Sequence, residues 1–191
     1  MNIGKLATVT ATILTFLLLG QTPSQAAVVS GVKFTDNYVS GQSELPLRGA
    51  ALYRYLVVIK AYAGALYLPE NVAPEDVLTD VPKHLVLSYF HAIKGEDFGS
   101  ATLKVMRKNV DSGTMTRLMP KVEQFNSFYT DVAPGDRYAI TYEPGMGTTL
   151  SLNGNAVGTI PGADFAAAIF SLWLGPEPID EKFKYALLGV E

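Results

Sequence analysis

The chain has 191 residues, a formal net charge of −3 and no cysteine. Its length predicts one domain, and 48% apolar against 17% charged residues provide a core and exclude a disordered chain. Acidic and basic residues are interspersed, so the overall field is not expected to attract nucleic acid or an anionic membrane surface. The lack of cysteine excludes disulfides and a lipid-attachment site of the bacterial lipoprotein kind.

The N-terminal segment has the layout of a secretory signal peptide. Lys5 gives it a positive start, Leu6–Leu19 is apolar, and Ser24 and Ala26 form a small-x-small cleavage site. The alternative is a membrane anchor, but about 14 apolar residues fall short of the roughly 20 that span a bilayer. We therefore predict a cleaved signal peptide over residues 1–26. The protein is then periplasmic or secreted, with no stable membrane anchor.

The mature domain, residues 27–191, is expected to begin with strands. The first covers 28–34. The segment 52–68 is rich in aromatic and β-branched residues, but as one straight strand it would run about 56 Å. A domain of this size has a radius of gyration of about 15 Å. The segment must therefore bend sharply or form two paired strands, with Gly64 a candidate for a bulge or a close approach.

The rest of the chain alternates between helical and strand periodicity, and Pro120 is expected to kink one helix or to separate two. Asn153-Gly154 is a strong hairpin signal. The expected elements are a short helix over 73–78, a strand over 84–90, helices over 94–110 and 115–128, strands over 137–142, 148–152 and 156–160, and helices over 163–174 and 180–188. This order predicts an α+β fold, an antiparallel sheet with helices on one face.

Five segments, in order along nearly the whole mature chain, carry a resemblance to a known family. They are Val-Ser-Gly-Val-Lys-Phe (29–34), the Leu-x-Gly-Ala-Ala-Leu-Tyr-Arg run (47–54), Ala-Tyr-Ala-Gly-Ala-Leu-Tyr-Leu (61–68), Gly-Thr-Ile-Pro-Gly-Ala-Asp-Phe (158–165) and Leu-Trp-Leu-Gly-Pro-Glu-Pro-Ile (172–179). Together they resemble the chalcone isomerase-like superfamily, and the last two look like its bacterial exported branch. The resemblance implies an open-faced β-sandwich, in which a large antiparallel sheet and a helical layer enclose a ligand cleft. The family contains isomerases that close a flavanone ring and non-catalytic members that hold fatty acids.

The resemblance also implies a ligand site that includes Arg54 and Tyr62. Arg54 matches the arginine with which the isomerases stabilise the substrate phenolate, and its planar cation suits a carboxylate or phenolate. Otherwise, Arg54 lies on an outer face, solvated or salt-bridged. Tyr62 matches a threonine of the isomerases and a tyrosine that joins the arginine in fatty-acid-binding members. With unbroken alternation the two residues, eight apart, share one strand face; otherwise, Tyr62 belongs to the core.

Phe98 and Val105 match positions at which the isomerases carry a catalytic tyrosine and an asparagine. Apolar residues there remove directional electrostatic stabilisation and leave a cleft suited to an amphipathic acid. We therefore expect non-catalytic binding of a fatty acid or similar apolar carboxylate, with Phe98 and Val105 in the tunnel wall and no catalytic residue. The alternatives are an isomerase, an intramolecular lyase acting on a phenolic or cyclic ketone, and an interaction module with a vestigial cleft.

Metal and cofactor chemistry have little support in the sequence. His84 and His91 flank one strand, and there is neither cysteine nor a His-x-x-x-His pair, so no metal site is expected. No cofactor is expected, although a single histidine leaves a haem ligand open. The turn at 145–148 is not a phosphate loop, because no lysine follows it.

The leader gives the first testable prediction. If residues 1–26 are a signal peptide, the intact mass of the exported protein corresponds to a chain that begins at Ala27 or Val28. Recovery of a membrane fraction that retains residues 1–26 would identify an anchor instead.

Overall fold

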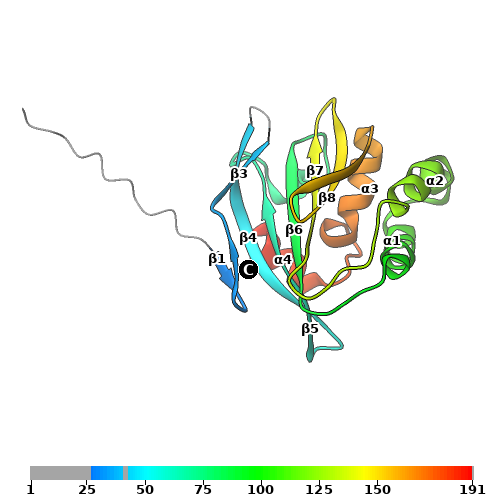
Figure 1. The fold of residues 1–191 in the computed structure, drawn as a ribbon. Coiled ribbons are helices and arrows are strands. Elements are labelled where there is room, and N and C mark those ends of the chain that lie inside the picture. The colour runs from blue at the N-terminus through cyan, green and yellow to red at the C-terminus, as the bar shows by residue number, and fades with distance from the viewer. Residues whose placement is uncertain (1–26, 41–42, 191) are drawn as a thin grey trace, which may run out of the picture.

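The structure is a computed structural model that describes residues 27–40 and 43–190 (Figure 1). The predicted leader, residues 1–26, lies outside the described residues, and its cleavage stays a prediction. Within the described part of the chain, no helix is long and apolar enough to cross a membrane.

Seven antiparallel strands form one sheet in which neighbours in sequence are neighbours in space. They are β3 (Asn37–Ser40), β4 (Ser43–Tyr55), β5 (Ile59–Tyr67), β6 (Lys83–Tyr89), β7 (Arg137–Glu143), β8 (Gly147–Leu152) and β9 (Asn155–Ile160). The 3-10 helix η1 (Pro74–Asp76) lies in the connection between β5 and β6. The segment between β6 and β7 contains two α-helices, so the topology is the expected α+β arrangement.

The α-helices pack on one face of the sheet, and a short ribbon packs on the other. The helices are α1 (Gly95–Asn109), α2 (Ser112–Asn126), α3 (Ala163–Leu174) and α4 (Glu181–Leu188). α4 packs on β4 and β5, α3 contacts β8, and α2 contacts β9. The ribbon consists of β1 (Ala27–Val29) and β2 (Val32–Phe34). Figure 1 shows β1 beside β4, away from α1 and α2.

Alternation along the strands divides the buried residues between two cores. In β5, Tyr62 and Leu66 belong to the large core under the helices. Their neighbours Ala63, Ala65 and Tyr67 belong to a smaller core on the ribbon side. Both faces of the sheet are therefore buried in this strand, which explains its nearly continuous apolar sequence.

The segment 52–68 forms two paired strands, which confirms one of the two alternatives predicted for it, a sharp bend being the other. β4 and β5 form a hairpin that turns at residues 56–58. Gly64 is a close approach rather than a bulge, because a Cβ there would lie 2.7 Å from Cζ of Phe183 and the ladder stays in register at this residue.

One expectation about element boundaries is wrong, and one of the two alternatives for Pro120 is excluded. The segment 28–34 is not one strand: Ser30 and Gly31 have φ of 49° and 88°, and the chain reverses there between β1 and β2. Pro120 does not separate two helices, because α2 continues through it. Met115, Leu118, Val122 and Phe125 are buried along this helix, and their packing outweighs the hydrogen bond that proline cannot donate.

His84 is a buried titratable group on the ribbon side of β6. Its ring stacks on Tyr38 with centroids 3.5 Å apart, and its Nδ1 lies 2.8 Å from Oγ1 of Thr141. Burial lowers the pKa of His84 from 6.5 to about 3. Between these two values the unfolded chain binds more protons than the folded one, so the free energy of unfolding falls as the pH is lowered through this window.

We predict that His84→Gln removes this part of the pH dependence. A shift of this size corresponds to on the order of 4 kcal/mol between pH 6.5 and pH 3, and urea unfolding of both proteins across the window measures it. Carboxylates titrate equally in the two proteins, so the difference isolates His84. His91→Gln is the matched control, because His91 is exposed. Parallel pH profiles for wild type and His84→Gln would contradict the assignment.

Candidate functional site

A cavity of about 800 Å³ lies between the helix-covered face of the sheet and helices α1 and α3. Its volume is within the range of small-molecule sites, about 300–1,000 Å³. Most of its wall is apolar or aromatic, including Leu87, Ile140, Leu150 and Leu172. A few polar groups stand in this wall, and their positions determine what the cavity can bind.

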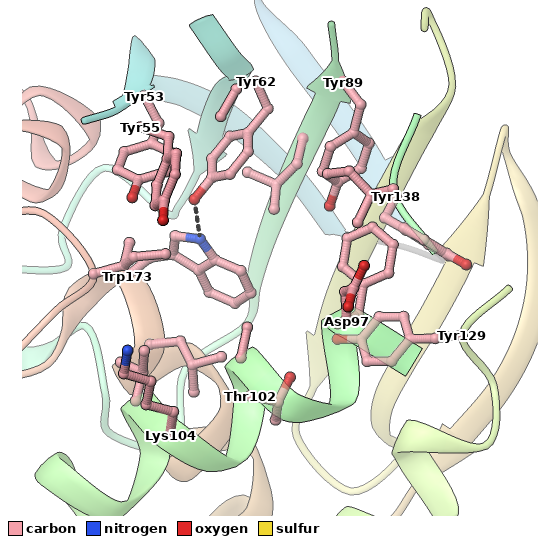
Figure 2. Close-up of a pocket in the computed structure, with 18 of the residues that line it drawn as sticks. Tyr53, Tyr55, Tyr62, Tyr89, Asp97, Thr102, Lys104, Tyr129, Tyr138 and Trp173 are labelled. Atoms are coloured by element: carbon pink, nitrogen blue, oxygen red, sulfur yellow. Dashed lines mark hydrogen bonds between the residues drawn. The ribbon is translucent and has the colours of Figure 1, made fainter. Parts of the chain in front are cut away.

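Three tyrosines stand in a row across three adjacent strands. Tyr53 of β4 is directly opposite Tyr62 of β5, and Tyr62 is directly opposite Tyr89 of β6. Their rings are in contact, with centroids 4.9 Å apart for the first pair and 5.7 Å apart for the second. All three line the cavity, and Figure 2 shows them along its upper wall. The sheet register therefore presents three phenol groups to one space.

The hydroxyl of Tyr62 accepts a hydrogen bond from Nε1 of Trp173, the chain's only tryptophan, at 3.1 Å (Figure 2). Both side chains are buried. The indole N–H uses an acceptor position of the hydroxyl, so the hydroxyl proton is available to another acceptor. Burial raises the pKa of Tyr62 far above its usual value. Tyr62 is therefore a neutral, oriented hydrogen-bond donor.

Tyr53 and Tyr89 supply further hydroxyls without fixed partners. No hydrogen bond among the described residues involves either hydroxyl group. Tyr89 is only 4% exposed, and burial raises its pKa well above the usual value. Burial also raises the pKa of Tyr53, with the nearby carboxylate of Asp180 adding to the effect. These phenols stay protonated at neutral pH.

Phe98 and Val105 of α1 line the cavity, and Val105 is buried. Phe98 lies within an aromatic cluster: its ring stacks on Tyr129 with centroids 5.1 Å apart and meets Tyr89 edge-on at 5.4 Å. Tyr138 completes this wall, but its hydroxyl is occupied, since it accepts from N of Thr130 at 2.8 Å and donates to that residue's carbonyl at 3.1 Å. The wall formed by Phe98, Tyr129 and Tyr138 is therefore stabilised by ring packing.

Arg54 does not lie in the cavity wall, and the expectation that it shares a strand face with Tyr62 is wrong. The chain turns at residues 56–58, so the two residues lie on adjacent strands. Tyr53 and Tyr55 line the cavity, and alternation turns Arg54, between them, to the opposite face. Arg54 is exposed and stands directly opposite Lys60. The prediction counted eight residues from Arg54 to Tyr62 along one strand and did not include the turn, so it placed Arg54 on the wrong face.

The cations that do line the cavity are Lys104 and Lys108, one helical turn apart on α1. Both are exposed, and neither forms an ion pair with any residue in the described ranges. Asp97 lines the cavity too, about 10 Å along the helix axis from Lys104. Figure 2 shows Lys104 on the side of Tyr53, Tyr55 and Trp173, and Asp97 on the side of Tyr129. The charged side chains of α1 that line the cavity are thus cationic toward one end and acidic toward the other. The carboxylate of Asp180, which does not line the cavity, also acts on Tyr53 and Tyr62.

Metal binding finds no support in the described part of the chain. No group of three or more His, Cys, Asp or Glu side chains lies close enough there to hold an ion. His91 lines the cavity as an exposed residue, whereas His84 is buried on the other face of the sheet.

Sequence reasoning found three of the cavity residues and missed most of the polar ones, among them Tyr53, Tyr89, Lys104 and Lys108. Tyr53 and Tyr89 were identifiable only with the pairing of β4, β5 and β6. Lys104 and Lys108 lie at i and i+4 on α1, a signal that was present in the sequence, but ordinary solvated helix faces show the same spacing.

Comparison with known proteins identifies the family and the fold of this chain. The sequence profile of the chalcone isomerase-like family matches residues 26–189. The structure is similar to that of AtFAP1, a fatty-acid binding protein of Arabidopsis thaliana, with a TM-score of 0.67, 18% identity, and coverage of 86% of this chain and 96% of that chain. No curated protein matches the sequence. The predicted fold is confirmed, and the bacterial exported branch stays a prediction.

The Trp173–Tyr62 contact gives a prediction. Tyr62→Phe leaves the buried indole N–H without its acceptor, so we expect a loss of about 1–3 kcal/mol in the free energy of unfolding, together with a change in Trp173 emission. Tyr53→Phe is the matched control, because its hydroxyl has no partner among the described residues, and its effect is expected to stay within about 0.5 kcal/mol. Equal stability losses for the two variants, measured by urea unfolding, would contradict the contact.

Proposed function

We propose that this protein, which belongs to the chalcone isomerase-like family, binds a fatty acid or a similar apolar carboxylate in its cavity. The observation that carries the proposal is the position of Tyr62: a neutral, oriented donor in an apolar cavity whose wall also carries Lys104 and Lys108. An amphipathic acid needs a donor and cation end for its head and an apolar space for its tail.

The head group is assigned to the end of the cavity that holds Lys104, Lys108 and Tyr62. A carboxylate there accepts a hydrogen bond from the Tyr62 hydroxyl and lies in the field of two lysines. The opposite end is less favourable for an anion, because Asp97 lines it and neither lysine does. Asp180 acts on Tyr62 but does not line the cavity, and the two lysines there outnumber it. The charge asymmetry of α1 therefore sets the orientation of the bound ligand.

The tail is assigned to the apolar space between the sheet and α3. Leu87, Ile140 and Leu150 project from three consecutive strands of the sheet, and Leu172 faces them from α3. Each methylene moved from water into this space contributes about 0.8 kcal/mol. Tail burial therefore supplies most of the affinity, and the polar end supplies orientation.

The likeness to AtFAP1 supports the proposal at the level of fold. That protein is a fatty-acid binding protein, and the sequence identity between it and this chain is 18%. Export also belongs to the proposal: a leader over residues 1–26 would place the binding protein in the periplasm or outside the cell.

An oleate titration tests the site. Trp173 lines the cavity and is the only tryptophan, so its emission reports occupancy directly. We expect saturable binding, weakened roughly threefold to tenfold by Tyr62→Phe through loss of one neutral hydrogen bond. Replacing Lys104 and Lys108 by glutamine should weaken binding by a similar factor, with added salt reducing the difference.

Arg54→Gln is the control for that titration. It removes a cation of the same sheet that lies outside the cavity, so the affinity for oleate should not change. A larger loss in Arg54→Gln than in the Lys104, Lys108 double variant would contradict the assigned head-group site.

A chalcone assay separates binding from isomerase activity. Phe98 and Val105 put apolar groups where the isomerases carry a tyrosine and an asparagine, so we expect chalcone absorbance to decay at the spontaneous rate in the presence of the protein. An acceleration of about a hundredfold, lost in Tyr62→Phe, would overturn the non-catalytic proposal.

A further inference from the structure

The β4–β5 hairpin ends in five consecutive large hydrophobic residues that are exposed to solvent. We call residues 55–59 the hairpin tip. The exposed fractions are 55% for Tyr55, 68% for Leu56, 81% for Val57, 74% for Val58 and 43% for Ile59. Figure 1 shows the hairpin projecting beyond the rest of the sheet. Elsewhere in the described residues, exposed large hydrophobic side chains are separate in sequence, as is normal for a protein surface.

The backbone of the tip also disfavours these side chains. Leu56 and Val57 have φ of 49° and 68°. Hairpin turns with positive φ prefer glycine, asparagine or aspartate, and a β-branched residue in this region is a genuine outlier. The tip therefore carries apolar side chains where neither burial in this chain nor turn geometry favours them.

Two cations lie at the base of the tip. Arg54 and Lys60 stand directly opposite each other at its base, and like charges in this position destabilise a hairpin. Neither is in an ion pair within the ranges that the structure describes. Lys104 and Lys108 of α1 line the cavity, whose wall also includes Tyr55 and Ile59 of the tip. The carboxylate of Asp180 acts on Tyr53, the residue before Arg54.

We propose that the hairpin tip inserts into the interface of an anionic phospholipid bilayer. Apolar residues enter the acyl boundary, and Arg54 and Lys60 contact the phosphates. A formal net charge of −3 does not draw the whole protein to such a surface. The local combination does, because apolar insertion and nearby cations act together within a Debye length of the headgroups.

The docked tip connects the bilayer with the cavity. Tyr55 and Ile59 belong both to the tip and to the cavity wall. An amphipathic ligand can therefore pass between membrane and cavity along the hairpin. This last step rests on the proposed function, whereas docking itself requires no ligand, so bilayer binding and oleate binding are separable measurements.

The absence of cysteine makes the test direct, since one introduced cysteine carries one environment-sensitive fluorophore. We would label Val57→Cys at the tip and, as the matched control, Met146→Cys. Met146 is 72% exposed and lies in the β7–β8 turn, at the opposite end of the sheet. Each protein is mixed with vesicles of phosphatidylcholine and phosphatidylglycerol in equal parts or of phosphatidylcholine alone. All variants have the same N-terminal form.

We expect a blue shift and an intensity gain for the Val57→Cys label on the anionic vesicles and no change for the Met146→Cys label. Arg54→Gln with Lys60→Gln should weaken the partitioning roughly fivefold per cation, while oleate binding by Trp173 emission stays unchanged. Equal responses from both labels, or none from the tip label, would overturn the proposal. A concentration-dependent shift of the tip label without vesicles would overturn it too, by identifying a second copy of the chain as the partner.

Discussion

The close packing of α4 on β4 and β5 determines where the cavity lies. Two glycines allow it: a Cβ on Gly49 would overlap the carbonyl oxygen of Ala186, and one on Gly64 would overlap the ring of Phe183. Helix and sheet therefore meet without a gap over this part of β4 and β5. Phe183 ends the packed region, with its ring 5.5 Å from that of Tyr62 and 6.0 Å from that of Tyr53. Beyond it, toward the hairpin tip, the same sheet face lies open to the cavity.

The chemistry of the cavity follows from which groups are buried. Phenol hydroxyls of the tyrosine row stay neutral because burial disfavours the phenolate, so they orient an acceptor without adding charge. The charged side chains, Lys104, Lys108 and Asp97, stay at exposed positions on α1. Lys104 and Lys108 can thus select an anion at little desolvation cost, and the deep wall can bury an alkyl tail. This division suits an amphipathic ligand.

Much of the fold was predictable from periodicity. The helix over 163–174 has the bounds predicted for it, and the strands over 137–160 agree closely, because Asn153-Gly154 and Gly145 mark their turns. The β4–β5 turn escaped prediction because its residues are leucine and valine rather than glycine or asparagine. The same unusual sequence that hid the turn is the basis for the proposed membrane contact.

The candidate site was predictable only in part, for reasons of register. Tyr62, Phe98 and Val105 line the cavity, and their roles in binding stay predictions. The predicted position of Arg54 is wrong because strand alternation was continued through a reversal of the chain. Tyr53 and Tyr89 join Tyr62 through pairings between strands that are distant in sequence, and one-dimensional spacing carries no information about such pairings.

A crystal structure of the protein with oleate tests the central claim most directly. We predict that the carboxylate lies within hydrogen-bonding distance of the Tyr62 hydroxyl at the lysine end, with the alkyl chain along Leu87, Ile140 and Leu150. An empty cavity at saturating oleate, or a carboxylate bound at the Asp97 end or at Arg54, would contradict it.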